Sequence, residues 1–441
     1  MKLRFFAVTL LSIGLHHVTV AQQDEQITLE RAIMLALEKN YDIKLAENTT
    51  TVTETDKDYA IGAYLPQINA NAATLRTLND QDLQFADATR NNSGPTEAVS
   101  KTASIQLVWT LFDGTRMFAT RQRLNALDQQ SELTLKDQMV NTIASVISNY
   151  YDIVRQKQSL KAIQEQMSVS EERVKLAERK LQVGTGIKPE LLQARVDYNA
   201  QRTQVIQQES TIQQLKQQLN VLTGSQLPAS FEVADTILID LNLDAQSLLG
   251  NAENTNFSLM AARENLSIAQ LSVWENKASY LPILNFNAAY NYNENNNRIL
   301  LNPFGTIYSL SNGFNYGLSL SLPILNGFNT RRLTQQSKIN VNRQSVLYEQ
   351  AKANVNVGLN NAFVNYENAK KILVIEEETI GLAKENVYIA LEGFKRGVTT
   401  FIELRTAQQS LADAYNRLIA ARYNTKLAET ELLRLSGGLL K

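Results

Sequence analysis

The sequence contains no cysteine, and its two histidines, His16 and His17, both lie in an N-terminal segment that reads as an export signal. The mature chain is therefore expected to lack both residue types. This excludes zinc sites built from His and Cys, Ser-His-Asp and Cys-His catalysis, and redox cysteine pairs. A glycine-rich phosphate loop is also missing. Chemistry by carboxylates alone stays open, but we expect a chain that is not an enzyme, uses no cofactor, has no metal site and is stabilised by packing.

The N-terminus carries the features of a secretory signal. Lys2 and Arg4 precede an apolar run, Phe5 to Leu15, that is too short to cross a bilayer. Thr19 and Ala21 occupy the −3 and −1 positions of a cleavage before Gln22. We predict a signal peptide at 1–21 and one mature protomer at 22–441. Without cysteine, that protomer cannot carry a lipid on an N-terminal Cys.

The chain has almost no excess of either charge, and it has few of the residues that break helices. The 43 Lys and Arg residues nearly balance 44 Asp and Glu, for a net charge of −1, so we expect no nucleic-acid partner. Only 18 glycines and 7 prolines occur among 441 residues, which is typical of helical rods.

Glycine and proline are both absent between Gly114 and Gly184. This predicts one helix over 115–183, which at 1.5 Å per residue is about 100 Å long. Glycines at the same two places return 213 positions later, as Gly327 and Gly397, and mark a second long helix. We therefore predict an internal two-fold repeat, with repeat 1 at about 22–224 and repeat 2 at about 243–437, in one elongated body.

Short alternating segments precede each long helix and predict strands at about 67–78, 101–112, 283–293 and 314–325. In the clearest of them one face is apolar and the other almost entirely asparagine. The apolar positions are Leu284, Phe286, Ala288, Tyr290 and Tyr292. The segments 79–100 and 294–312, rich in Asn, Gly and Pro, are expected to be exposed loops.

The polar faces of these strands carry almost no charge, which favours a membrane β-barrel over a half-buried sheet of a soluble protein. Four strands cannot close a barrel, and an open edge in lipid is costly. Strands must therefore come from several copies of the chain. Three copies would supply twelve strands, an even number within the known range.

The helices that follow the long ones carry a seven-residue apolar repeat of Leu and Ala, typical of coiled coils. In the last helix the repeat consists of Leu404, Ala407, Leu411, Ala414, Leu418, Ala421, Ala428, Leu432 and Leu435. The earlier helix has the corresponding series Leu191, Ala194, Tyr198, Val205, Ile212, Leu215, Leu219 and Leu222. Taken alone, these helices would fit an ordinary soluble coiled coil better than a membrane-associated tunnel.

A short turn joins each pair of helices, and the two turns share Gly, Glu, Leu and Ala at the 213-residue offset. Gly184 and Gly397 suit the positive φ that ends a helix, and Glu190 and Glu403 suit the first turn of the next helix. These residues are fully explained as caps. The functional interpretation is that both hairpins end at one tip, far from the barrel, as a docking surface.

With these features the whole mature chain resembles the TolC-like outer membrane efflux proteins of Gram-negative bacteria. The resemblance rests on the duplication, on two strands and one long helix in each half, and on the Gly-x5-Glu-Leu-x2-Ala turns. It implies a mixed, mainly α fold: a trimeric 12-stranded barrel in the outer membrane, four strands per chain, continued by a long α-helical coiled-coil tunnel in the periplasm. It further implies a passive channel that contacts outer membrane lipid, docks on a periplasmic adaptor and thereby meets an inner-membrane pump.

The resemblance also implies roles for residues in the turns. Gly184, Thr185 and Gly186, with Gly397, Val398 and Thr399, match the turns that contact the adaptor. Glu403 matches an acidic ring at the periplasmic entrance, which would favour cations. A second acid of some relatives is replaced by Thr406, with Arg405 beside it, and Glu190 is the counterpart of Glu403 in the first repeat.

Two hypotheses concern opening of this entrance. Thr399 stands where relatives often have a basic residue that holds the tip closed, so Lys188, Lys395 or Arg396 could substitute for it. The second hairpin would move outward relative to the first to open the tip, since two near-equal hairpins can pack in two arrangements. The competing class is a periplasmic coiled-coil adaptor or scaffold protein.

Overall fold

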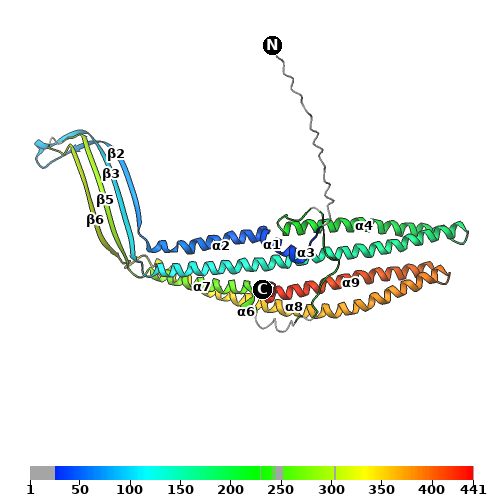
Figure 1. Ribbon diagram of the computed structural model, residues 1–441. Coiled ribbons are helices and arrows are strands. Elements are labelled where there is room, and N and C mark those ends of the chain that lie inside the picture. Colours follow the sequence, from blue (N-terminus) through cyan, green and yellow to red (C-terminus); the bar gives the residue numbers. More distant parts are fainter. Residues whose placement is uncertain (1–24, 229, 242, 244–251, 302–303, 441) are drawn as a thin grey trace, which may run out of the picture. The chain divides into compact units, whose positions relative to one another are not determined.

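The computed structural model describes residues 25–440 except 229, 242, 244–251 and 302–303 (Figure 1). The predicted signal peptide, 1–21, lies outside the described residues. The helices of the first half are α1 (Leu29–Lys39), α2 (Tyr41–Tyr59), α3 (Arg116–Gln182) and α4 (Lys188–Leu222). Those of the second half are α6 (Ala252–Thr255), α7 (Phe257–Ala278), α8 (Asn329–Lys395) and α9 (Phe401–Ser436).

The predicted repeat is visible in the helices and in the backbone. Helices α3 and α8 have 67 residues each and begin 213 positions apart, which confirms both long helices. Positive φ angles recur at the same offset in three glycine pairs, which are Gly114 and Gly327, Gly184 and Gly397, and Gly224 and Gly437. A side chain disfavours this backbone conformation, so glycine ends each element at equivalent places of the two halves.

The four predicted strands form one antiparallel sheet in the order β2-β3-β5-β6. Their bounds are β2 (Gln67–Leu83), β3 (Asn92–Phe112), β5 (Ile283–Ile299) and β6 (Tyr308–Ser321). The side chain of Trp109 anchors β3 where β2 begins, because its Nε1 donates to the carbonyl oxygen of Tyr64 at 2.9 Å. That carbonyl belongs to the Tyr-Leu-Pro segment at which the preceding helical turn ends.

The expectation of long exposed loops at 79–100 and 294–312 is wrong. Strand pairing continues to Leu83 and Asn92 in the first pair and to Asn296 and Tyr308 in the second. These outer parts are mostly polar on both faces, so little apolar periodicity marks them, yet their residues still pair across the strands. At its other end β6 stops at Ser321 rather than at 325. Pro323 follows, and proline has no N–H to donate to a ladder.

Residues of both repeats form two compact units. The sheet unit comprises Tyr41–Ala144, Asp240–Lys371 and Leu427–Lys441, and the hairpin unit comprises Met1–Asn40, Ser145–Ile239 and Ile372–Lys426, each in its described part. In the sheet unit, a core beside the sheet's helices brings together Ala252, Leu359, Ala362, Tyr366 and Leu432. The hydroxyl of Tyr366 donates to the carbonyl oxygen of Asp240 at 2.5 Å, which satisfies the polar end of this buried ring.

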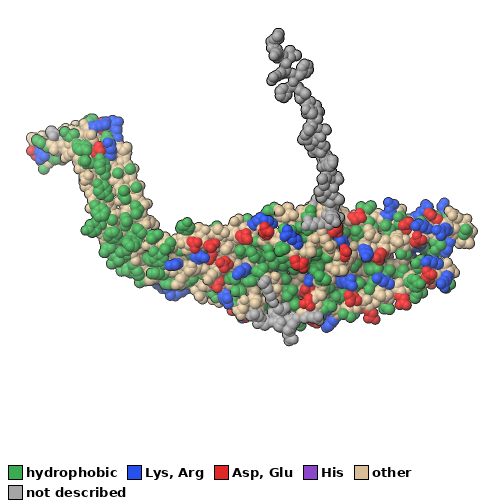
Figure 2. Space-filling model, in the orientation of Figure 1, with side chains coloured by type: hydrophobic (Ala, Val, Ile, Leu, Met, Phe, Trp, Pro, Cys, Tyr) green, Lys and Arg blue, Asp and Glu red, His purple; other side chains and the backbone are tan. Residues whose placement is uncertain are grey.

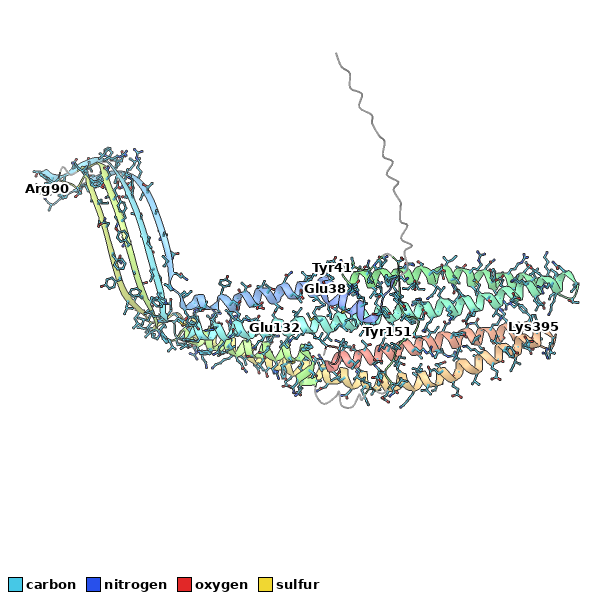
Figure 3. The ribbon with its side chains drawn as sticks, in the orientation of Figure 1. Glu38, Tyr41, Arg90, Glu132, Tyr151 and Lys395 are labelled. Carbon is cyan, nitrogen blue, oxygen red and sulfur yellow. The ribbon has the colours of Figure 1, made fainter. Side chains whose placement is uncertain are left out.

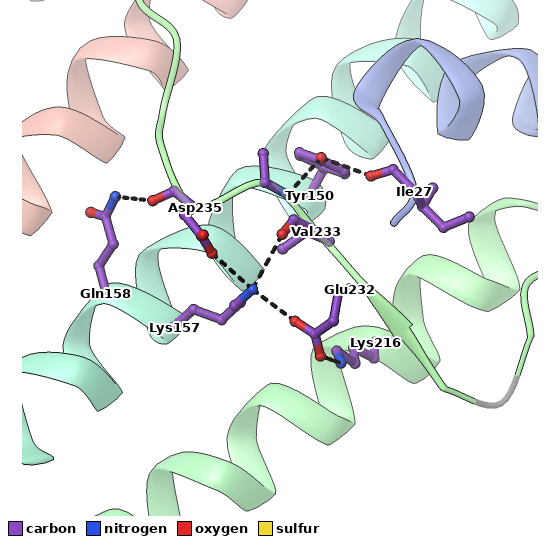
Figure 4. Close-up of polar contacts among 9 residues, drawn as sticks. Ile27, Tyr150, Lys157, Gln158, Lys216, Glu232, Val233 and Asp235 are labelled. Atoms are coloured by element: carbon purple, nitrogen blue, oxygen red, sulfur yellow. Dashed lines mark hydrogen bonds and ion pairs between the residues drawn. The ribbon is translucent and has the colours of Figure 1, made fainter. Parts of the chain in front are cut away.

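The hairpin unit includes a two-stranded parallel sheet of β1 (Glu25–Gln26) and β4 (Phe231–Glu232). Glu232 holds it to the helices, because its carboxylate accepts from Lys157 of α3 at 2.7 Å and from Lys216 of α4 at 2.8 Å (Figure 4). Burial alone would raise the pKa of Glu232, but the two lysines outweigh burial and lower it. Tyr150 adds a second link, since its hydroxyl donates to the carbonyl oxygen of Ile27 at 2.9 Å.

The seven-residue series of α9 is confirmed as a buried seam. Leu404, Ala414 and Leu432 are almost completely buried, and so is Thr425, the polar residue that stands between Ala421 and Ala428 and interrupts the apolar series. Its hydroxyl donates to the carbonyl oxygen of Ala421 at 2.8 Å, which removes the cost of burying it. Among the described residues, no helix combines the length and apolarity needed to cross a membrane.

Candidate docking and entrance site at the helical hairpins

The first hairpin closes through backbone hydrogen bonds around Gly184. The N–H groups of Thr185 and Gly186 both donate to the carbonyl oxygen of Lys180, at 3.0 and 2.9 Å. Gly186 has to be a glycine, because a methyl group built on it would lie 2.9 Å from the backbone N of Leu181. α4 then begins with Pro189 in its first turn, where a missing N–H costs nothing.

The second hairpin has the same backbone pattern with different side chains. The N–H groups of Val398 and Thr399 donate to the carbonyl oxygen of Gly393, at 2.9 and 3.2 Å. A methyl group built on Gly393 would overlap the hydroxyl of Thr399 and lie 3.1 Å from its Cβ. The small residue therefore follows the turn in the first hairpin, as Gly186, and precedes it in the second, as Gly393.

Glu403 forms a capping box with Thr400 at the start of α9. Its carboxylate accepts from the Thr400 backbone N–H at 2.7 Å and from the Thr400 hydroxyl at 2.9 Å, while the Glu403 N–H donates back to that hydroxyl at 3.3 Å. The hydrogen bond from the Thr400 backbone lowers the pKa of Glu403, so this exposed carboxylate is ionised at neutral pH. Glu403 therefore stabilises the start of its own helix, α9.

The other entrance residues predicted from the sequence lie in different surroundings. Thr406 is exposed, and its hydroxyl donates to the carbonyl oxygen of Ile402 at 3.0 Å. Glu190 is half-buried in the first turn of α4. Lys395, at the end of α8 (Figure 3), pairs with Glu392 of its own helix at 2.8 Å, so this contact does not join the two hairpins.

Arg405 does join the two hairpins. Its Nε lies 3.3 Å from Asp197 of α4, and the same carboxylate also contacts Arg173 of α3, at 2.6 Å. The side chain of Arg173 is 4% exposed, whereas that of Arg405 is 54% exposed. Burial lowers the pKa of Arg173, and the nearby Asp197 opposes that effect. No pattern in the sequence indicates this cluster, because its members are far apart along the chain.

The cluster borders a cavity of about 710 Å³ between α3, α4, α8 and α9. Glutamines such as Gln201, Gln204 and Gln408 line much of it, and Gln408 accepts from Arg173 at 3.1 Å. Tyr415 closes another part by donating to Glu165 at 3.0 Å, and burial together with this carboxylate raises the pKa of Tyr415 to about 12. A polar cavity of this size can hold water.

Both tips expose apolar side chains beside the predicted docking residues. Val398 is 81% exposed, and Ile402, Val183 and Ile187 are also exposed. Elsewhere in this unit, Lys180 of α3 lies over the ring of Phe394 of α8, with its Nζ 4.1 Å from the ring centroid. The described residues contain no group of three acidic, His or Cys side chains that could hold a metal ion.

The sequence model of the outer membrane efflux proteins matches residues 32–225 and 248–438, which is most of the chain and close to the two repeats. The chain belongs to this family. It is 24% identical over 381 residues to the outer membrane protein TolC of Vibrio cholerae serotype O1, covering 86% of this chain and 83% of TolC. The outer membrane efflux protein BepC of Brucella suis biovar 1 is 22% identical over 421 residues, covering 93% and 85%.

Solved channels of the family share the fold. The CmeC outer membrane channel of Campylobacter jejuni superposes with a TM-score of 0.79 at 16% identity, over 93% of this chain and 85% of CmeC. The family comprises transport channels rather than enzymes. As a member of the outer membrane efflux proteins, this chain is an outer membrane channel of a Gram-negative efflux system, with its helices on the periplasmic side.

Proposed function

We propose that three copies of this chain form one passive exit duct, which docks by its hairpin tips on a periplasmic adaptor and through it on an inner-membrane pump. The proposal of an oligomer rests on the two unpaired edge strands of the sheet. Among the described residues, β2 pairs only with β3 and β6 only with β5. Unpaired edges are costly in lipid, and joining β6 of one copy to β2 of the next removes all of them.

Native mass spectrometry of the detergent-extracted mature protein tests the trimer. We expect a trimer as the dominant species, because a closed ring satisfies both edges of each sheet and three copies supply twelve strands. A stable monomer or dimer would leave four or eight strands and would overturn the proposed twelve-stranded barrel.

The docking surface proposed for the adaptor consists of the two turns, Gly184–Gly186 and Gly397–Thr399. Its support is the exposure of Val398 and Ile402 in one hairpin and of Val183 and Ile187 in the other. Exposed apolar side chains that surround glycine turns provide a surface that a partner can cover.

Val398→Asp should abolish copurification with the cognate adaptor while the trimer persists. Val374→Asp is the matched control, since Val374 is also an exposed valine of the hairpin unit but lies far from the turn along α8. If Val398→Asp bound the adaptor as strongly as the unmodified protein does, the turn of the second hairpin would not be part of the docking surface.

The entrance proposed here opens when the second hairpin separates from the first. Among the contacts that resist opening is the ion pair of Arg405 with Asp197, supported by Arg173. The natural chain has no cysteine, so Asp197→Cys with Arg405→Cys allows a thiol-reactive crosslinker to be placed between the hairpins alone. Crosslinking should block efflux, and treatment of either single variant should not. Full transport with the crosslink formed would refute the movement.

A further inference from the structure

On the apolar face of the sheet, charged residues begin part of the way along the strands. Residues paired directly across antiparallel strands lie on the same face. The pairing therefore places the rows Ile68-Leu107-Ala288-Tyr316 and Ala70-Ile105-Tyr290-Phe314 on one face. Two rows further from the helices, the same face carries Thr74, Lys101, Glu294 and Leu310. Figure 2 shows this change as apolar side chains along the sheet and basic ones near its far end.

Five charged residues lie at this boundary in two separate ion-paired groups, and we call the five together the boundary cluster: Arg76, Glu97, Lys101, Glu294 and Arg298. Lys101 pairs with Glu294 at 3.1 Å. Glu97 accepts from both arginines, at 3.0 Å from Arg76 and 3.3 Å from Arg298. The hydroxyl of Tyr292 also donates to Glu294, at 2.9 Å.

The basic and acidic members of the boundary cluster differ in exposure. The side chains of Arg76, Arg298 and Lys101 are 59%, 58% and 56% exposed, whereas those of Glu97 and Glu294 are 11% and 19% exposed. The carboxylates therefore lie beneath the bases and hold them in place, and the accessible surface is positive. With three bases and two acids, the cluster also keeps one uncompensated positive charge.

The next acid on this face of β2 lies further from the apolar band. Asp80 is two residues beyond Leu78, which pairs with Glu97, and this places it about 7 Å past the Glu97 row along the strand. If a second copy adds its β6 beside β2, it brings no carboxylate, because Tyr308–Ser321 contains no charged residue.

We propose that the boundary cluster binds the phosphate groups of lipids in the outer leaflet of the outer membrane. The sheet end that carries it is the one away from the helices, and the helices are periplasmic. A phosphate at the headgroup level lies where the apolar band stops, and arginine matches phosphate oxygens with paired N–H donors. The proposal rests on the outer membrane location of the sheet and on neither adaptor docking nor the movement of the hairpins.

Native mass spectrometry of the full mature protein with two lipids tests the site. The probes are lipid A with its phosphates and the same lipid after enzymatic removal of the phosphates. We expect the phosphorylated lipid to be retained and the dephosphorylated one to be lost. A basic side chain beside an anionic lipid contributes about fivefold in affinity. Arg76→Gln, Lys101→Gln and Arg298→Gln should therefore each weaken retention by about that factor, and the triple variant should abolish it.

Arg90→Gln is the matched control. Arg90 lies at the same end of the sheet, in the loop between β2 and β3 (Figure 3), where its guanidinium is 5.2 Å from the ring centroid of Phe85. The Arg90→Gln variant should retain the phosphorylated lipid as well as the unmodified protein does.

Equal retention of the two lipids by the unmodified protein would overturn the proposal, as would full retention by the three single variants. Displacement of the lipid by millimolar inorganic phosphate would also overturn it, because the site would then bind free anions. The single variants keep the test decisive if the triple variant does not fold.

Discussion

The carboxylate of Asp197 lies between two guanidinium groups, 2.6 Å from Arg173 and 3.3 Å from Arg405. These contacts tie α3 and α4 of the first hairpin to α9 of the second. The two arginines differ in what they lose without Asp197. Arg173 would remain buried without a charged partner, whereas Arg405 would return to solvent.

Asp197→Asn should destabilise the protein by about 3 kcal/mol, because removing one partner of a buried ion pair leaves an uncompensated charge. Arg405→Gln should change stability by at most about 1 kcal/mol, as expected for an exposed pair. Thermal unfolding of the detergent-solubilised protein measures both. Equal losses would show that Arg173 does not depend on Asp197.

Gly393→Ala should destabilise the second hairpin by about 1–3 kcal/mol, because the added methyl group collides with Thr399. Adding Thr399→Gly should restore most of the loss, since the first hairpin combines a large residue, Lys180, with Gly186 at the equivalent positions. Hydrogen exchange of the turn amides reports on each variant. If the double variant were as unstable as Gly393→Ala, the collision with Thr399 would not be the cause of the loss.

Glu403→Gln should reduce stability at neutral pH but not in acid. The folded-state pKa of Glu403 is lowered from 4.5 by the Thr400 hydrogen bonds, so its stabilisation is fully present above 4.5 and disappears as the pH falls through the lower, folded-state value. Melting curves of both proteins at pH about 7 and about 3 check this prediction. A constant difference between them across this range would contradict it.

Gly114→Ala should cost more stability than Gly327→Ala, although the two glycines are equivalent in the repeat. Both have positive φ, at +74° and +63°, and each alanine therefore costs about 1–2 kcal/mol. At Gly114 the new methyl group would also meet the carbonyl oxygen of Ala278 and lie 2.8 Å from Cβ of Leu281, whereas nothing lies within 4 Å at Gly327. Unfolding midpoints of the two variants compare the costs directly, and equal midpoints would exclude the steric contribution.

Local patterns in the sequence were sufficient for the helices and for the positions of the strands. The stretch between Gly114 and Gly184 predicted α3 almost to the residue, since continuous helix needs only local hydrogen bonds and the absence of breakers. Leu404 and Leu432 are buried as the seven-residue repeat predicted. The strand ends were wrong wherever both faces are polar, as at Asn92, because pairing there depends on a partner strand rather than on apolar contrast.

For the candidate site, the sequence located the turns but not the contacts between them. Glu403 was expected in the first turn of α9 and lies there, paired with Thr400, whereas its role at the entrance stays a prediction. Arg405 was selected for its position beside Thr406, and its contact with Asp197, 208 residues earlier, went unforeseen. Lys395 was considered as a residue that could hold the tip closed, but the structure pairs it with Glu392 of its own helix.

The sequence by itself determined the duplication, the export-compatible composition, the helices and the apolar faces, because each depends on spacing along the chain. Only the tertiary structure decided which charges meet. It placed Asp197 between Arg173 and Arg405, and it covered Glu97 while exposing Arg76. Charged side chains are long and compatible with many positions on a surface, so their partners follow from how the elements pack and not from their order in the chain.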